Sequence, residues 1–157
     1  MSYGCQIWGM SPNAQRIIRL QKSAVRILTF SNFNSHTKPI FRDLKILSLP
    51  DLIFLSNIIL IYQILNDISP IDICNIFNLH YQSSNHLTRS VSQKQLSRPM
   101  VRTTSFGLQS IQYRSILNWN SLQHKHLEHD LVSLKPSKLK LICRNFLLDQ
   151  CPNGLAA

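Results

Sequence analysis

The stretch SLPDLIFLSNIILIYQIL, residues 48–65, decides the fold, because it is the strongest apolar run of the chain. Pro50 falls in its first turn and Asp51 at its positive end, a pairing typical of a helix start. The run is apolar on nearly all sides, which predicts a helix buried in the core. Its most apolar part, Leu52 to Leu65, contains Ser56, Asn57 and Gln63 and is short for a bilayer, so a core helix is favoured over a membrane span.

A second helix precedes this run. Ser11 as N-cap and Pro12 at the first helical position predict a helix that continues to about Thr29. Apolar side chains recur on one of its faces at helical spacing, and we expect this face to pack against the core. These side chains are Ile17, Leu20, Ala24, Ile27 and Leu28.

The rest of the chain predicts further short helices around one polar segment. Helices are expected at about 39–47, 70–77, 112–122 and 136–149, and a long polar loop near 82–105. The last helix should turn Leu139, Ile142, Phe146 and Leu147 inward. With only 4 glycines, a glycine-rich all-β fold is disfavoured. The expected fold is mainly α, a small irregular helical domain of five or six helices packed through faces centred on Ile17, Ile58, Ile142 and Phe146.

Charge divides the chain unevenly. The net charge is +10, from 17 basic and 7 acidic residues. Two basic segments, 1–45 and 84–157, flank an apolar and slightly acidic one, 46–83. This asymmetry indicates a polyanionic partner, either nucleic acid or an anionic membrane surface, although a solvated basic surface without a partner is the alternative. We expect three parts: a helical segment 1–80, a polar basic loop 81–112 and a C-terminal helical segment 113–157.

The basic residues of the early helix form a stripe. Arg16, Arg19, Lys22 and Arg26 lie within about 120° of one another on a helix of 3.6 residues per turn. No acidic residue occurs from 1 to 42, whereas an ordinary solvated face mixes the two signs. The full set of predicted nucleic-acid contacts is Arg16, Arg19, Lys22, Arg26, Arg89, Arg98, Arg102, Lys138 and Arg144.

Two aromatic residues are further candidates. Tyr113 and Trp119 have the side chains that stack on nucleic-acid bases. Their helical spacing is more often that of core residues, which is the favoured interpretation.

Catalytic and metal-binding patterns are missing from the sequence. It contains no Asp-Asp pair for two-metal phosphoryl transfer, no G-x-S-x-G, no P-loop and no H-E-x-x-H. The four cysteines (Cys5, Cys74, Cys143, Cys151) have no metal-site spacing, and a solvated turn is favoured over a metal site for His124, His126 and His129. We expect no cofactor, no catalysis, reduced thiols and an intracellular protein.

Several short motifs occur in an informative order. They are Tyr3 to Gly9 (YGCQIWG), Leu20 to Leu28 (LQKSAVRIL), Ser35 to Phe41 (SHTKPIF) with Leu44 to Leu47 (LKIL), His86 to Arg89 (HLTR), Arg102-Thr103, Leu117 to Leu122 (LNWNSL) and the Ser- and Lys-containing segment from Ser133 to Leu148 (SLKPSKLKLICRNFLL). In order and spacing they resemble the C-terminal, thumb and post-thumb region of jockey-like non-LTR (LINE-type) retrotransposon reverse transcriptases. Two positions depart from the family pattern: Gln123 where a proline is usual, and Ser115 where a glycine is common.

This resemblance implies a function. In the family, the catalytic aspartates of the RNA-directed DNA polymerase lie upstream of the Tyr-Gly-x-x-x-Trp-Gly segment, and the region after it grips nucleic acid. We therefore expect a truncated C-terminal fragment that binds the template–primer or the element RNA, without a catalytic centre of its own, and whose other partner is the missing upstream polymerase domain. The alternatives are a helical protein-interaction module and a non-functional remnant. A peripheral membrane protein is less favoured, because the basic helix lacks a matching bulky aromatic face.

Overall fold

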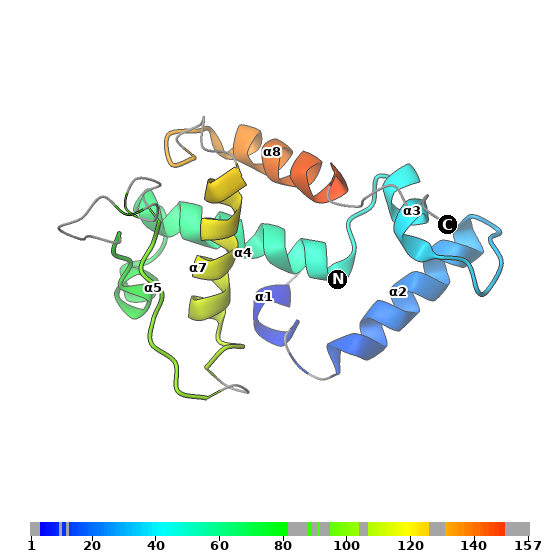
Figure 1. The fold of residues 1–157 in the computed structure, drawn as a ribbon, viewed down its shortest axis with the longest axis horizontal. Coiled ribbons are helices and arrows are strands. Elements are labelled where there is room, and N and C mark those ends of the chain that lie inside the picture. The colour runs from blue at the N-terminus through cyan, green and yellow to red at the C-terminus, as the bar shows by residue number, and fades with distance from the viewer. Residues whose placement is uncertain are drawn as a thin grey trace. The chain divides into compact units, whose positions relative to one another are not determined.

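The structure, a computed structural model, describes residues 4–9, 11, 13–81, 88, 91, 95–103, 107–125 and 131–149. This part of the chain is mainly α-helical, as predicted, and shows no strand, only an isolated bridge between Tyr81 and Leu96. Its helices are α1 (Cys5–Trp8), α2 (Ala14–Leu28), α3 (Thr37–Asp43), α4 (Leu49–Leu65), α5 (Ile71–Phe77), α7 (Ile111–Lys125) and α8 (Pro136–Asp149) (Figure 1).

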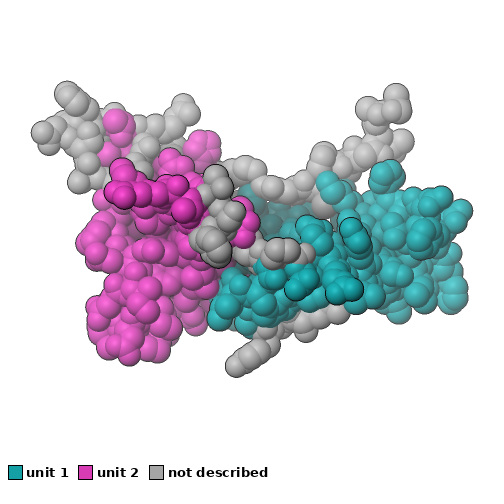
Figure 2. Space-filling view, turned by 90° about the horizontal axis from the view of Figure 1, so that it is seen from below, with its two compact units in different colours: residues 1–55, 140–157 teal, residues 56–139 magenta. Residues whose placement is uncertain are grey.

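The chain forms two compact units, coloured separately in Figure 2. Unit 1 contains residues 1–55 and 140–157, and unit 2 contains residues 56–139. The long helices α4 and α8 each contribute to both units. This grouping follows contacts in space, whereas the expected parts 1–80, 81–112 and 113–157 follow chain order, so those parts stay a prediction.

The core of unit 1 forms where α1 and α2 meet the start of α4. Cys5, Ala14, Leu49 and Ile53 are buried there, and Trp8, Ile17 and Ile18 pack against them. Gly9 ends α1 at a point where a Cβ atom would overlap both the Ile53 side chain and the Cys5 carbonyl. The glycine therefore allows α1 to approach α4 closely, which gives the second glycine of the YGCQIWG motif a packing role.

The α8 part of unit 1 is joined to α3 and α4. The rings of Phe54 and Phe146 stack with their centroids 6.0 Å apart. One guanidinium nitrogen of Arg144 donates a 2.8 Å hydrogen bond to the carbonyl of Lys45. Of the residues predicted to face inward on α8, Leu139 and Leu147 are buried, while Ile142 and Phe146 are half-buried.

Asp51, the acidic residue expected at the positive end of the central helix, also caps its start. The hydroxyl and the backbone N–H of Ser48 both donate to the carboxylate of Asp51, the N–H at 3.2 Å. An acidic side chain in the first turn also favours the helix dipole. The predicted helix with Pro50 in its first turn and an end at about Leu65 is confirmed, since α4 spans Leu49–Leu65.

Two predicted helix boundaries were wrong. Regular helix begins at Ala14, not at Pro12, because the Ser11 carbonyl accepts the N–H of Ala14 at 2.9 Å in a preceding turn. The helix predicted over 39–47 spans Thr37–Asp43 instead. It ends there because Lys45 adopts a left-handed conformation, with φ of 52°, that stops helical propagation.

Four helices end in a left-handed residue that is not glycine. These residues are Phe30, Lys45, Asp67 and Asn78, after α2, α3, α4 and α5 respectively. After α2 the N–H of Ser31 reaches the Arg26 carbonyl at 3.0 Å and the N–H of Phe30 reaches the Ile27 carbonyl at 3.2 Å, which is the Schellman pattern. Glycine is the usual residue at this position, so Phe30 holds a strained backbone.

Unit 2 buries the second half of α4 together with α7. Its largest fully buried side chains include Trp119, Ile58 and Ile61. Hydrogen bonds from side chains to backbone tie its connecting segments: the Tyr62 hydroxyl donates to the Leu134 carbonyl at 2.7 Å, and the Gln112 amide donates to the Phe77 carbonyl at the end of α5 at 2.9 Å.

The connection before α7 is fixed by one asparagine. The Asn120 side chain accepts the Leu96 N–H at 2.9 Å and donates to the Leu96 carbonyl at 2.9 Å. It thereby satisfies both backbone groups of a buried residue. Much of the predicted loop 82–105 lies outside the described residues. Of those that are described, Val91 is helical, contrary to the prediction, and the stretch 95–103 contains no helix.

Candidate nucleic-acid interface

Helix α2 has three faces, not the two that the sequence predicted. Its packed face contains Ala14 and Val25, which are buried, and Ile17, Ile18 and Gln21, which are partly buried. The stripe predicted to face the core is therefore wrong except at Ile17, since Leu20, Ala24, Ile27 and Leu28 are exposed. The cause is geometric: apolar residues cover about half of the α2 circumference at 100° per residue, and unit 1 covers only one edge of that arc.

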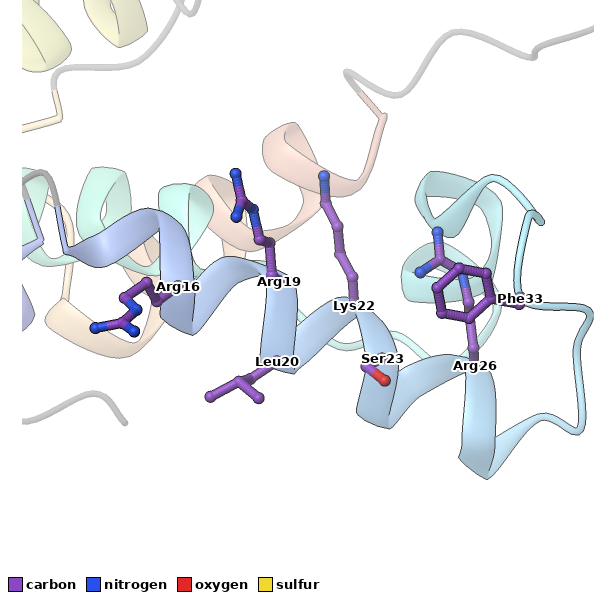
Figure 3. Close-up of a pocket in the computed structure, with 7 residues that line it drawn as sticks. All are labelled: Arg16, Arg19, Leu20, Lys22, Ser23, Arg26 and Phe33. Carbon is purple, nitrogen blue, oxygen red and sulfur yellow. The ribbon is translucent and has the colours of Figure 1, made fainter.

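The basic face lies between the packed face and the exposed apolar stripe. Arg16, Arg19 and Lys22 are exposed on it, and Arg26 is half-buried. Figure 3 shows these side chains along one helix, with those of Arg19 and Lys22 extending from the same side. The structure thus brings together the four residues predicted to bind on this helix.

An open hollow of about 720 Å³ follows this face. Its lining consists of Arg16, Arg19, Leu20, Lys22, Ser23, Arg26 and Phe33. No carboxylate is among the lining residues, and within the described ranges none of the four cations forms an ion pair with an acidic side chain. Concentrated positive charge without internal neutralisation gives the hollow a field that attracts anions.

Arg26 fixes the loop that follows α2 at one end of the hollow. Its Nε donates to the Ser35 carbonyl at 3.1 Å, which ties the loop after α2 back onto the helix. Its guanidinium carbon lies 5.8 Å from the centre of the Phe33 ring, within cation–π range. Figure 3 shows the ring beside this guanidinium.

Gln21 fixes the basic helix to the start of α4. Its amide nitrogen donates to the Leu47 carbonyl at 3.1 Å, and its amide oxygen accepts the Leu49 N–H at 2.9 Å. The side chain therefore connects α2 to the α3–α4 connector and caps one free N–H at the beginning of α4. The position of the basic face in unit 1 depends on this contact as well as on the apolar core.

The other predicted contact residues are dispersed. Arg98, Arg102 and Lys138 are exposed in unit 2, and Arg144 is exposed in unit 1 with its hydrogen bond to Lys45. Arg89 lies outside the described residues. The four cations of α2, by contrast, line a common hollow.

The two residues predicted as candidates for base stacking, Tyr113 and Trp119, are not exposed. Trp119 is fully buried in unit 2, so the core interpretation is correct for it, and Tyr113 is partly buried. Phe33, Leu20 and Ser23 line the hollow but were not predicted as site residues. Phe33 lies between the helix expected to end at about Thr29 and the one expected to begin at about Pro39. The signal that could have identified it is an aromatic residue soon after the end of a basic helix.

No metal site or reactive thiol emerges from the described residues. No group of three or more His, Cys, Asp or Glu side chains is arranged to hold a metal ion in these ranges. His124 is exposed, and His126 and His129 lie outside the described residues. Cys5, Cys74 and Cys143 are free thiols, and burial raises the pKa of Cys143 from 9.0 to about 12, which keeps that thiol protonated.

Comparison of the chain with protein-family models, with curated proteins and with solved structures finds no match. Among the described residues, no helix has both the length and the apolar character needed to cross a bilayer. The site is therefore characterised by its own chemistry: an open basic hollow lined by an exposed aromatic ring.

Proposed function

We propose that this chain binds the sugar–phosphate backbone of RNA or DNA through the basic face of α2. The observation that carries the proposal is the alignment of Arg16, Arg19, Lys22 and Arg26 along one open hollow without a neighbouring carboxylate. Ten residues of helix from the first to the last cation span about 15 Å. The stripe is therefore long enough to contact more than one phosphate of a nucleic-acid strand.

Such contacts recognise charge and spacing, not base sequence. Arginine and lysine side chains that neutralise phosphates release counterions, so affinity falls as salt concentration rises. The described part of the hollow offers no Asn or Gln side chain for bidentate base contacts. We therefore expect binding that depends strongly on salt and little on base sequence.

The motif resemblance supplies a biological setting for this binding. We propose that the chain is a C-terminal fragment of a LINE-type reverse transcriptase that grips template–primer or element RNA and works beside an upstream polymerase domain. On this proposal the chain has no polymerase activity of its own. Primer extension in Mg²⁺ by the purified chain, abolished by mutating one of its aspartates, would contradict it.

The decisive experiment changes charge at one place only. The variant Arg16, Arg19, Lys22 and Arg26→Gln removes the four cations and keeps helix propensity, because Gln is a good helix former. The control Lys38, Lys45, Lys135 and Lys140→Gln removes the same charge from residues that do not line the hollow. Binding of an oligonucleotide is measured over a salt series for both variants and the parent.

The expected results separate a local site from general charge. Each lost phosphate contact lowers the slope of log affinity against log salt by roughly 0.7 to 0.9, so the hollow variant should lose a slope of about 3. The control should keep most of the parent slope. Equal slopes for the parent and the hollow variant would overturn the proposal, and no binding by the parent at physiological salt would favour a non-functional remnant.

A second candidate function rests on the exposed apolar stripe of α2. Leu20 is 66% exposed, Ile27 70% and Leu28 67%, and exposed apolar side chains gathered on one face often mark protein contacts. In this alternative the chain is a helical interaction module, and the cations only surround an apolar contact. An Ile27 and Leu28→Gln variant, which leaves the lining of the hollow intact, should bind nucleic acid like the parent if the first function holds. A parent that binds no nucleic acid but self-associates or binds another protein through these two side chains would favour the second.

A further inference from the structure

Phe33 is an exposed aromatic ring in a fixed position. Its side chain is 79% exposed, although a free phenylalanine ring gains free energy by leaving water. The Arg26 guanidinium lies over the ring at 5.8 Å from its centre. Since most of the ring surface is in solvent, a large part of it is available to a ligand.

The loop that carries Phe33 is held by its own hydrogen bonds. The Phe33 N–H donates to the Asn32 side-chain oxygen at 2.9 Å, and the Ser35 N–H donates to the Asn32 carbonyl at 2.9 Å. At its two ends, Thr29 and Ser31 share a 2.7 Å hydroxyl–hydroxyl contact, and Arg26 holds the Ser35 carbonyl. A ring on such a turn loses little conformational entropy when it binds a flat partner.

Phe33 also lies next to the cations. It lines the same hollow as Arg19 and Lys22, and no lining residue is acidic. A ligand that fits this arrangement is anionic at regular intervals and carries a flat π surface beside the charge. Nucleic acid has both features, but in a duplex each base is already stacked on its neighbours, whereas an unpaired base offers a free face.

We infer that the hollow binds single-stranded nucleic acid, with one unpaired base stacked on Phe33 and adjacent phosphates on the α2 cations. This inference rests on the proposed function and restricts the expected ligand to single-stranded nucleic acid. Leu20 adds apolar surface to the same lining, and Ser23 adds a hydroxyl that can donate to a phosphate oxygen. The stacked base is not identified by hydrogen bonds, so any base is accepted.

The test compares two exposed phenylalanines. Phe33→Ala removes the ring that lines the hollow, and Phe30→Ala removes a ring that is 97% exposed but does not line it. Phe33→Leu keeps apolar bulk without a π face, and Phe33→Trp keeps the π face. Each full-length variant is titrated with a fluorescent oligo(U), an oligo(dT) and a duplex of the same length, after its Tm is compared with that of the parent.

Stacking of a base on Phe33 predicts which variants lose affinity and which keep it. Loss of a base–aromatic stack of about 1 to 3 kcal/mol weakens single-strand binding roughly 5- to 150-fold. Phe33→Ala and Phe33→Leu should show this loss on both single strands, whereas Phe30→Ala and Phe33→Trp should bind like the parent. Duplex affinity and the salt slope should stay unchanged in all four variants, because no phosphate contact is removed.

The outcomes distinguish this inference from the proposed function beneath it. If the parent binds with a steep salt slope but Phe33→Ala binds single strands equally well, the stacking inference fails and backbone binding stands. Equal weakening of single-strand and duplex binding, or parent-like binding by Phe33→Leu, also overturns stacking. If the parent binds no nucleic acid, both fail; binding only to vesicles of anionic lipid in that case would indicate that Phe33 enters a membrane surface.

Discussion

Replacing Asn120 with alanine should destabilise the protein through a single backbone residue. In the parent, the Asn120 amide pairs with both the N–H and the carbonyl of Leu96 at 2.9 Å each, and Leu96 is fully buried. Alanine leaves both groups without a partner. Each unsatisfied buried group costs about 1 to 3 kcal/mol, so the free energy of unfolding should fall by about 2 to 6 kcal/mol.

Urea unfolding followed by circular dichroism measures this change, and the adjacent Ser121→Ala is its control. The Ser121 hydroxyl is exposed and donates to the Leu117 carbonyl at 2.9 Å within the same helix, so its loss should cost well under 1 kcal/mol. Amide exchange at Leu96 should be slow in the parent and fast in Asn120→Ala. Equal stability of the two variants would refute the role assigned to Asn120.

An Asn120→Asp variant tests the same contact by its protonation. The ionised carboxylate still accepts the Leu96 N–H but faces the Leu96 carbonyl without a proton to donate. Burial beside a carbonyl should raise the pKa of this carboxyl group above that of Asp in the unfolded chain. The folded state then binds a proton more readily than the unfolded state, so the variant should recover stability relative to the parent as the pH falls through the folded-state pKa.

Three further predictions follow from local geometry. Phe30→Gly should raise the free energy of unfolding by about 1 kcal/mol, because it relieves a left-handed residue whose side chain is almost wholly exposed; a lower urea midpoint would contradict this. The pKa of Cys143 is raised by burial from 9.0 to about 12, so the folded state keeps its proton while the unfolded state loses it, and stability should decline over that pH range. In urea unfolding at several pH values, the free energy of unfolding of Cys143→Ala should fall less with rising pH than that of the parent. If the parent and the variant show the same pH dependence, the thiol is not buried as described. Gln21→Ala should cost about 1 to 3 kcal/mol through the lost contact with the Leu49 N–H and should speed amide exchange there, whereas unchanged exchange would show that Gln21 is not the cap.

The helical architecture could be predicted from the sequence because its signals are local. Apolar periodicity and proline positions located α4, α5 and α8 within about one residue. The end of α3 was harder to predict, because Lys45 occupies a position where glycine normally marks the stop. The pairing of Asn120 with Leu96 spans 24 residues, and no local pattern predicts such a contact.

The candidate site was predicted in part. Helical spacing places Arg16, Arg19, Lys22 and Arg26 on one face whatever the helix packs against. Tertiary contacts decide which part of the wide apolar arc of α2 is covered, and helical spacing does not reveal them. Leu20, Ile27 and Leu28 were therefore expected in the core, whereas the structure exposes them. Phe33 joins the hollow because Arg26 draws the following loop back onto α2, and that return is a property of the folded chain.

Backbone-amide chemical shifts during titration with a single-stranded oligonucleotide test most directly whether α2 is the binding surface. We predict that the largest shifts fall on residues 14–36, including Phe33, and that they shrink together as salt is raised. The buried residues around Trp119 should shift little. Shifts confined to residues 95–103 or to α8, with residues 14–36 unmoved, would contradict the assignment of binding to α2.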